Sequence, residues 1–126
     1  MNEIQILNSS SVAAPIGPYS HATVFGGLLF CTGQLPLLAS GEMIAGSPAE
    51  QAERCLHNLA EVCATAGGSL DHALRVGIYL TDLGSFPSVN EVYARFVPHR
   101  PARTTVEVAA LPMGAAVEID AIVALL

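Results

Sequence analysis

Arg103 is the side chain that points most directly to chemistry, because it places a positive charge on a segment with the pattern of a β-strand. The segment covers residues 101–108, in a chain of 126 residues that has five arginines and no lysine. A guanidinium there must be paired or must face a ligand, since burying an unpaired charge is costly. Its planar fork binds a carboxylate or a phosphate through two hydrogen bonds, which a lysine does not reproduce. The first hypothesis is therefore an anion site.

Carboxylates able to exchange protons lie on neighbouring segments. Period-two alternation places Arg103, Thr105 and Glu107 on one face of the penultimate strand, and Glu118 and Asp120 together on one face of the last strand. We expect these two strands to be adjacent and antiparallel, so that the arginine, the hydroxyl and the carboxylates share faces. A cationic anchor near such a carboxylate is the minimum equipment for acid–base chemistry on a small anionic substrate. The structural alternative is that Arg103 bridges Glu107 or Glu118 and holds the sheet or an oligomer together.

Histidines and cysteines indicate no second site. The histidines are His21, His57, His72 and His99, and the cysteines are Cys31, Cys55 and Cys63. None of them has metal-ligand spacing, so we expect no metal and predict surface or hydrogen-bonded histidines. The cysteines form no CxxC pair and lie in apolar surroundings, which predicts buried, reduced, unreactive thiols. No P-loop, dinucleotide fingerprint or GxSxG motif occurs.

The composition predicts one domain, residues 1–126, that associates with copies of itself. Hydrophobic residues make up 52% of the chain and charged residues only 13%, too few to cover a small monomer, which indicates an apolar subunit interface. The net charge of −6, with scattered arginines, argues against a nucleic-acid or anionic-membrane surface. The N-terminus lacks a signal pattern and no apolar run approaches the ~20 residues of a membrane span. We therefore expect a cytoplasmic protein.

The elements that must position these residues begin with a hairpin and a long helix. Residues 4–7, 22–25 and 28–31 are β-prone, and Gly26-Gly27 predicts a tight turn between the last two runs. The proline-containing loop before them carries Tyr19. If Tyr19 has no functional role, it is an ordinary half-buried loop tyrosine. A Ser47-to-Glu50 capping box with Pro48 predicts a helix that continues in three- and four-residue apolar steps to Gly67-Gly68.

The remaining elements complete an α+β pattern. Residues 73–80 predict a strand and residues 82–85 a turn. A second helix is expected over 86–97 with Ser85 as its cap, and it carries Asn90, an exposed or capping polar residue on the structural reading. Strands near 104–110 and 116–125 close the chain. The order β-β-β-α-β-α-β-β predicts two helices packed on one face of a mixed sheet.

Five blocks of the sequence resemble the RidA family, also called YjgF or L-PSP endoribonuclease, in order and approximate spacing. They are Ile-Gly-Pro-Tyr-Ser at 16–20, Thr-Gly-Gln-Leu-Pro at 32–36, Asp-Leu-Gly-Ser-Phe at 82–86 with Val-Asn at 89–90, Pro-Ala-Arg-Thr-Thr-Val-Glu-Val at 101–108, and Val-Glu-Ile at 117–119. One block alone would be weak, but five in register over nearly the whole chain are specific.

The resemblance implies a chorismate-mutase-like α+β fold assembled as a homotrimer, whose sheets form a central barrel with three sites in the clefts between subunits. It implies hydrolysis of reactive enamines and imines, such as 2-aminoacrylate, 2-iminopropanoate and 2-iminobutanoate, to 2-oxo acids and ammonia. No metal or organic cofactor is used by the family's archetypal members. A homotrimer also agrees with the apolar excess.

By position, the resemblance also implies roles for individual residues. Arg103 matches the arginine that grips the substrate carboxylate, and Glu118 the glutamate that positions or activates water. Tyr19 matches the tyrosine of the Gly-Pro-Tyr loop, Asn90 the helix asparagine, and Gly33 the backbone beside the substrate.

Three features depart from the family archetype. Thr32 replaces a serine and keeps the hydroxyl. Thr105 replaces the cysteine often found two residues after the arginine, so no function that depends on this thiol is carried over. The segment between the second helix and Pro101 is shorter, which changes the rim of the site and bears on substrate size.

Other functions remain open at this point. A ribonuclease or translation inhibitor would need a basic RNA track, which a lysine-free chain of net charge −6 supplies poorly. A non-catalytic trimer that binds a small ligand in the same clefts is a third class. Deaminases of ring-cleavage or pyrimidine-breakdown intermediates belong to the first class and are not separated from it by the sequence.

Overall fold

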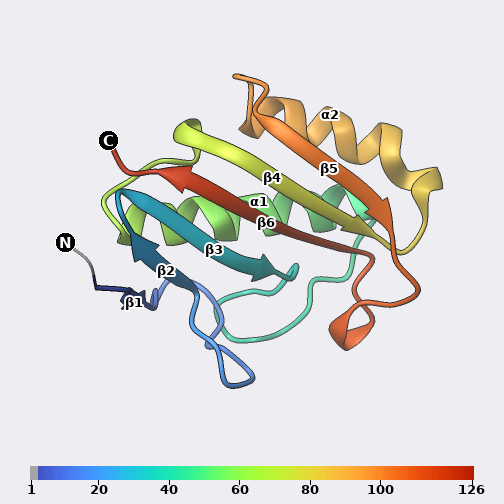
Figure 1. The fold of residues 1–126 in the computed structure, drawn as a ribbon. Helices are drawn as coiled ribbons and strands as arrows, with labels where there is room; N and C mark the ends of the chain where they lie inside the picture. Colours follow the sequence, from blue (N-terminus) through green and yellow to red (C-terminus); the bar gives the residue numbers. More distant parts are fainter. Residues whose placement is uncertain (1–2) are drawn as a thin grey trace.

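A computed structural model describes residues 3–126, and its elements follow the predicted order (Figure 1). Met1 and Asn2, the start of the N-terminal segment considered above for a signal, lie outside the described residues. The strands are β1 (Gln5–Leu7), β2 (Ala22–Phe25), β3 (Leu28–Gln34), β4 (Ala73–Leu80), β5 (Ala102–Glu107) and β6 (Val117–Ala124). The helices are α1 (Pro48–Thr65) and α2 (Phe86–Phe96), with short 3-10 turns η1 (Leu70–His72), η2 (Leu83–Ser85) and η3 (Pro112–Gly114).

The six strands form one mixed sheet in the order β1-β2-β3-β6-β4-β5. β6 pairs antiparallel with both β3 and β4, whereas β5 lies at the edge and pairs in parallel with β4. The expectation that the last two strands are adjacent and antiparallel is therefore wrong. β4 and β5 are joined by the crossover helix α2. This helix returns the chain to the end of the sheet at which β4 begins, so β5 runs parallel to β4. The loop after β5 then carries the chain past β4, so that β6 lies on the side of β4 opposite to β5.

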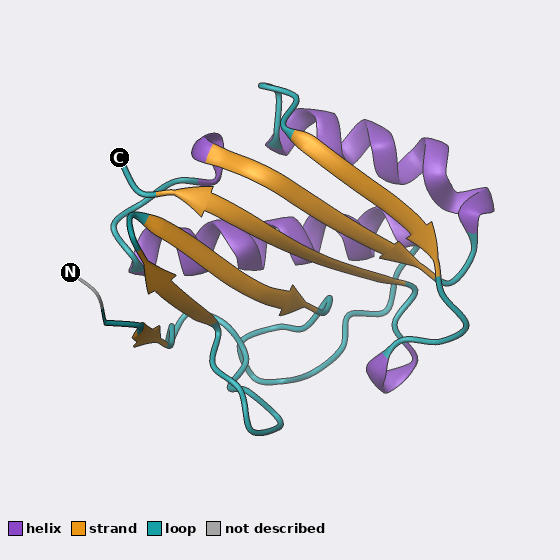
Figure 2. Cartoon of the chain, in the orientation of Figure 1, coloured by secondary structure: helices purple, strands orange, loops and turns teal. Residues whose placement is uncertain are grey.

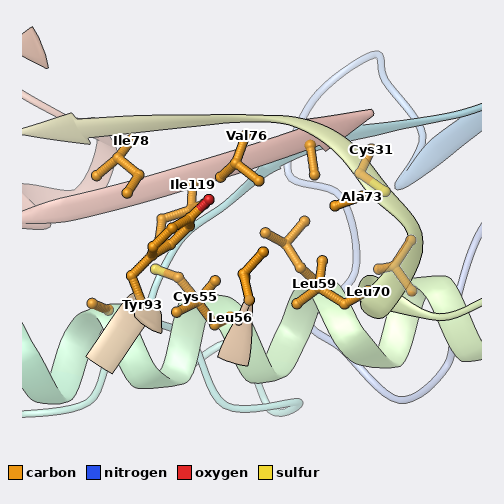
Figure 3. Close-up of a cluster of buried hydrophobic side chains, with 14 of the residues drawn as sticks. Cys31, Cys55, Leu56, Leu59, Leu70, Ala73, Val76, Ile78, Tyr93 and Ile119 are labelled. Carbon is orange, nitrogen blue, oxygen red and sulfur yellow. The ribbon is translucent and has the colours of Figure 1, made fainter. Parts of the chain in front are cut away.

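Both helices cover the same face of this sheet, as the sequence predicted (Figure 2). The core between the helices and the sheet is built from buried aliphatic side chains. Among them, Leu56 and Leu59 of α1 face Val76 and Ile78 of β4 (Figure 3). In β6 every second residue from Val117 to Val123 is buried, as period-two alternation requires. Among residues 3–126 no helix covers the opposite face, which we call the helix-free face.

Local signals explain where the elements begin and end. The Glu50 N–H donates to the Ser47 Oγ at 3.2 Å and the Ser47 N–H to a Glu50 carboxylate oxygen at 2.9 Å, so the predicted capping box is confirmed. Gly26 and Gly27 have φ values of 59° and 79°, the left-handed conformation of a tight hairpin turn. Ser85, in contrast, does not cap α2 with its side chain, because its hydroxyl donates to the Asp82 carbonyl at 2.7 Å.

The cysteines and two of the histidines have structural roles. Cys31, Cys55 and Cys63 are free and buried, as predicted, and burial raises the pKa of the Cys55 thiol. The predicted hydrogen-bonded state is confirmed for His21 and His99, whose ring nitrogens lie 2.8 Å from the carbonyls of Ala13 and Ala73, respectively. In the described part of the chain no group of three His, Cys, Asp or Glu side chains could hold a metal ion, and no helix could cross a membrane.

Candidate functional site

Arg103 lies against α2, held by an amide and two aromatic rings. One of its terminal nitrogens donates to the Asn90 Oδ1 at 2.7 Å. The guanidinium carbon lies 4.8 Å from the centroid of the Tyr93 ring and 5.3 Å from that of Phe86, both within cation–π range. We call Arg103, Asn90, Phe86, Tyr93 and Thr105 the arginine cluster. Its other members are neutral, so the charge of Arg103 is not cancelled locally.

The arginine cluster contains no ion pair. Among residues 3–126 the one ion pair within 4.0 Å joins His57 and Glu61 on α1. Within residues 3–126, therefore, Arg103 forms no ion pair with Glu107 or Glu118 that would hold the sheet together. A Glu107 carboxylate oxygen instead accepts the Leu83 N–H at 2.9 Å. Most of the five N–H donors of the Arg103 guanidinium remain available for an anion.

Two buried hydroxyls accompany this guanidinium. The Thr105 Oγ1 and the Tyr93 hydroxyl are buried without a hydrogen-bond partner in residues 3–126. Burial raises the pKa of Tyr93, which keeps its hydroxyl protonated. Unpaired buried hydroxyls are destabilising and are usually satisfied by water, a ligand or another chain.

A cleft of about 670 Å³, which we call the arginine cleft, opens beside this cluster. Its walls include Arg103, Asn90, Tyr93 and Ala94, together with Arg100 and apolar residues of the segment that follows α2. This size is typical of a small-molecule site.

Glu118 lies on the helix-free face, against a bulge in β3. The pairing of β3 with β6 shifts in register between Cys31 and Gln34. A Cβ on Gly33 would come within 2.9 Å of the Glu118 carboxyl carbon and would overlap its carboxylate, so a side chain at position 33 would displace Glu118. Glycine is required at the bulge for this close approach.

A second carboxylate lies beside Glu118. Burial raises the pKa of Glu118, and the Asp120 carboxylate raises it further. Asp120 accepts a hydrogen bond of 2.9 Å from the Tyr79 hydroxyl through one oxygen, while its other oxygen is buried without a partner in the described chain. A Cβ on Gly77 would lie 2.9 Å from the Tyr79 hydroxyl and would overlap Asp120. The raised pKa makes Glu118 a stronger proton acceptor than an ordinary carboxylate.

Tyr19, Thr32 and Gly33 are brought together on the side of Glu118. They line a small cavity of about 20 Å³ with His21. Tyr19 is 45% exposed, and its hydroxyl oxygen accepts the Ile16 N–H at 3.3 Å. His21 fixes the loop, since its Nδ1 accepts the Ser9 N–H at 2.9 Å while its Nε2 donates to a loop carbonyl. We call Glu118, Gly33, Thr32, Tyr19 and Asp120 the glutamate cluster.

The two clusters lie on opposite faces of the sheet. Arg103 pairs in register with Val76 and Thr105 with Ile78, both fully buried under the helices. Glu118 alternates with the buried residues of β6 and therefore faces away from the helices. A single chain thus assembles two groups of predicted residues but does not bring Arg103 and Glu118 to one site.

Several residues near these clusters were not predicted to be part of a site. Phe86 and Tyr93 are two of them, and they lie four residues before and three residues after the predicted Asn90, which places the amide and both rings on one helix face. This spacing could have indicated that an amide and two aromatic rings together contact the Arg103 guanidinium. No comparable signal pointed to the Tyr79–Asp120 hydrogen bond, because it joins two strands 41 residues apart in the sequence.

Comparisons with known proteins agree over nearly the whole chain. The family model described as Endoribonuclease L-PSP matches residues 10–125. The RutC family protein y4sK of Sinorhizobium fredii is 43% identical over 125 residues, which cover 97% of this chain and 98% of that protein. The chloroplastic Reactive Intermediate Deaminase A of Arabidopsis thaliana is 36% identical over 123 residues, covering 96% of this chain and 66% of that protein.

A solved structure also matches over nearly the whole chain. Escherichia coli TdcF with bound serine has a TM-score of 0.89 and 32% identity, and the match covers 95% of this chain and 98% of that chain. The α+β arrangement of six strands and two helices is therefore shared over almost the full length of both chains.

Proposed function

Since the chain belongs to the endoribonuclease L-PSP family, which includes the reactive intermediate deaminases, we propose that it hydrolyses small 2-imino and 2-enamino acids. Its substrates are 2-iminobutanoate, 2-iminopropanoate and the enamine 2-aminoacrylate, and its products are 2-oxo acids and ammonia. The observation that carries this proposal is the Arg103 guanidinium, held by Asn90 and two rings without a carboxylate partner among residues 3–126.

The proposed site combines the two clusters from different copies of the chain. Because Arg103 and Glu118 face opposite sides of the sheet, a site that contains both requires a second subunit. A homotrimer with a chorismate-mutase-like arrangement, whose helix-free faces form a central barrel, would place the sites in the clefts between subunits. This assembly is supported by Phe30 of β3 and Val106 of β5, apolar side chains that are 40% and 38% exposed.

In the proposed reaction Arg103 binds the substrate carboxylate and Glu118 moves protons. Two charge-assisted hydrogen bonds from the guanidinium fix the position of C2. The Glu118 carboxylate takes a proton from water as the water oxygen attacks C2 of the iminium and the C=N π electrons move to nitrogen. Glu118 returns the proton to nitrogen, ammonia leaves as the C2–oxygen bond becomes double, and the hydroxyl proton passes to solvent. An enamine first takes a proton at C3.

The other predicted residues complete this site. Asn90 and Thr105 lie on the side of the substrate carboxylate, while Tyr19, Thr32 and Gly33 lie on the side of the attacking water. The serine bound to TdcF is a small 2-amino acid, and this supports a carboxylate and a nitrogen on C2 as the groups recognised. The reaction uses no thiol, so Thr105 is compatible with it, and it uses no metal or cofactor.

The test is to generate 2-iminobutanoate in place with threonine dehydratase and to follow its loss. We expect the wild type to accelerate hydrolysis over buffer and Arg103→Ala to lose about 100-fold or more in kcat/KM, since a charge-assisted bidentate contact is removed. Arg95→Ala is the matched control, because Arg95 is an exposed arginine at the end of α2 outside the arginine cleft. No acceleration by the wild type would overturn the deaminase proposal, and full activity of Arg103→Ala would overturn the anchor.

The endoribonuclease in the family description is the second candidate. It is disfavoured by a chain of five arginines, no lysine and net charge −6, which offers RNA no basic track. RNA cleavage that persists through repurification and is lost in Glu118→Gln would reverse the ranking. Free, buried cysteines support the further proposal of a reducing, cytoplasmic location.

A further inference from the structure

A second arginine, Arg100, lines the arginine cleft together with Arg103. It lies in the short loop that joins α2 to β5, at the edge of the sheet (Figure 1). Two residues lie between the two arginines in the sequence, so their Cα atoms are at most about 11 Å apart. Two of the five basic residues of a chain with net charge −6 thus line one cleft.

The backbone at Arg100 is held in an uncommon conformation. Its φ is 59°, in the left-handed region that costs energy for a residue other than glycine. The loop is fixed by the His99 Nε2, which donates to the Ala73 carbonyl at 2.8 Å, and Pro98 and Pro101 flank it. Arg100 is therefore presented from a rigid turn.

Neither arginine has an acidic partner within residues 3–126, where the one ion pair within 4.0 Å lies on α1. Two like charges on one cleft repel each other, and an anion between them removes this repulsion. The arginine cleft, at about 670 Å³, is large for a three- or four-carbon imino acid, and it has room for a longer substrate. One carboxylate is used by Arg103 in the proposed reaction, so Arg100 is available for a second.

We propose that Arg100 determines specificity by binding a second carboxylate, so that the preferred substrates are 2-imino dicarboxylates. This inference rests on the proposed deaminase function and narrows its substrate class. Arg103 binds the carboxylate on C2, and Arg100 binds the one at the far end of the substrate chain. Since Arg100 is exposed, its contribution is at the low end for an ion pair, about fivefold in kcat/KM.

The experiment compares two imines of equal length that differ in one charge. An amino acid oxidase with catalase produces 2-iminopentanedioate from glutamate and 2-iminopentanoate from norvaline, and hydrolysis of each is followed with and without the protein. We expect the wild type to prefer the dicarboxylate. Arg100→Asn should lower kcat/KM about fivefold for the dicarboxylate, through KM, and leave 2-iminopentanoate unchanged. Asparagine tolerates a positive φ, so this variant should fold.

Two further variants and one salt series complete the test. Arg100→Lys should keep much of the preference because the charge remains, Arg95→Ala should not alter it, and added salt should reduce it. Equal rates on both substrates, or an equal loss on both in Arg100→Asn, would overturn the dicarboxylate inference while the deaminase function stands. If no imine, including 2-iminobutanoate, is hydrolysed faster than in buffer, the proposed function and this inference both fail.

Discussion

The arginine cluster and the glutamate cluster position their charged groups in different ways. Arg103 is surrounded by neutral groups, an amide and two aromatic faces, which fix its orientation and leave its charge unchanged. Glu118 is partly buried beside a second carboxylate, and both factors raise its pKa. The first environment suits a permanent anchor, whereas the second suits a group that gains and loses a proton. Within one chain the group suited to anchoring, Arg103, and the group suited to proton exchange, Glu118, lie on opposite faces of the sheet.

Glu118→Gln should have the largest effect and should distinguish the two clusters. Glutamine is close in shape to glutamate and fits beside Gly33, but it does not accept a proton from water. We expect kcat on 2-iminobutanoate to fall about 100-fold or more, with a much smaller change in KM. Steady-state kinetics measure both, and a rise in KM at constant kcat would assign Glu118 to binding instead.

Arg103→Lys should affect binding more than the chemical step. A lysine keeps the charge but loses the planar fork and its fit between the rings of Phe86 and Tyr93. We expect about a tenfold loss in kcat/KM on 2-iminobutanoate, carried mainly by KM. If the lysine variant loses as much as Arg103→Ala, shape rather than charge is the main contribution of this residue.

Gly33→Ala should test how closely the glutamate cluster is packed. An added Cβ overlaps the Glu118 carboxylate, so the carboxylate has to move and activity should fall severalfold or more. The free energy of unfolding should fall by about 1–3 kcal/mol, as for other overpacked sites. Denaturant unfolding measures the second quantity, and an unchanged midpoint with full activity would contradict the close approach.

Asp120→Asn should have the smallest effect, a shift in the pH dependence. Removing the neighbouring negative charge should lower the raised pKa of Glu118, so the acidic limb of kcat/KM should move to lower pH with little change at its plateau. Tyr79→Phe, which removes the hydrogen bond but keeps the Asp120 carboxylate, is the control. An acidic limb that does not move in Asp120→Asn would show that Asp120 does not act on Glu118.

The same pKa shift affects stability. The Glu118 pKa in the folded protein lies above the value of about 4.3 expected in the unfolded chain. The folded state therefore binds this proton more tightly, and the free energy of unfolding should fall as the pH rises from about 4.3 through the folded pKa. Glu118→Gln should remove this part of the pH dependence.

Elements whose signals are contained in a few consecutive residues were predicted closely. β4 begins and ends at the predicted residues 73 and 80, and α1 starts after its capping box. The strand predicted at 104–110 instead spans Ala102–Glu107, and the one predicted at 28–31 continues to Gln34. These ends depend on pairing with other strands, which the local pattern does not contain.

The sequence by itself determined the residue types, the alternation along each strand and the likeness to a family, and with them the seven candidate site residues. Only the tertiary structure decided that β4 separates β5 from β6, and that Arg103 and Glu118 consequently face opposite sides of the sheet. The physical reason is that alternation fixes which residues share a face of a strand, whereas strand order depends on contacts between distant segments. Those contacts also brought Arg103 between two rings of α2 and Glu118 against Gly33.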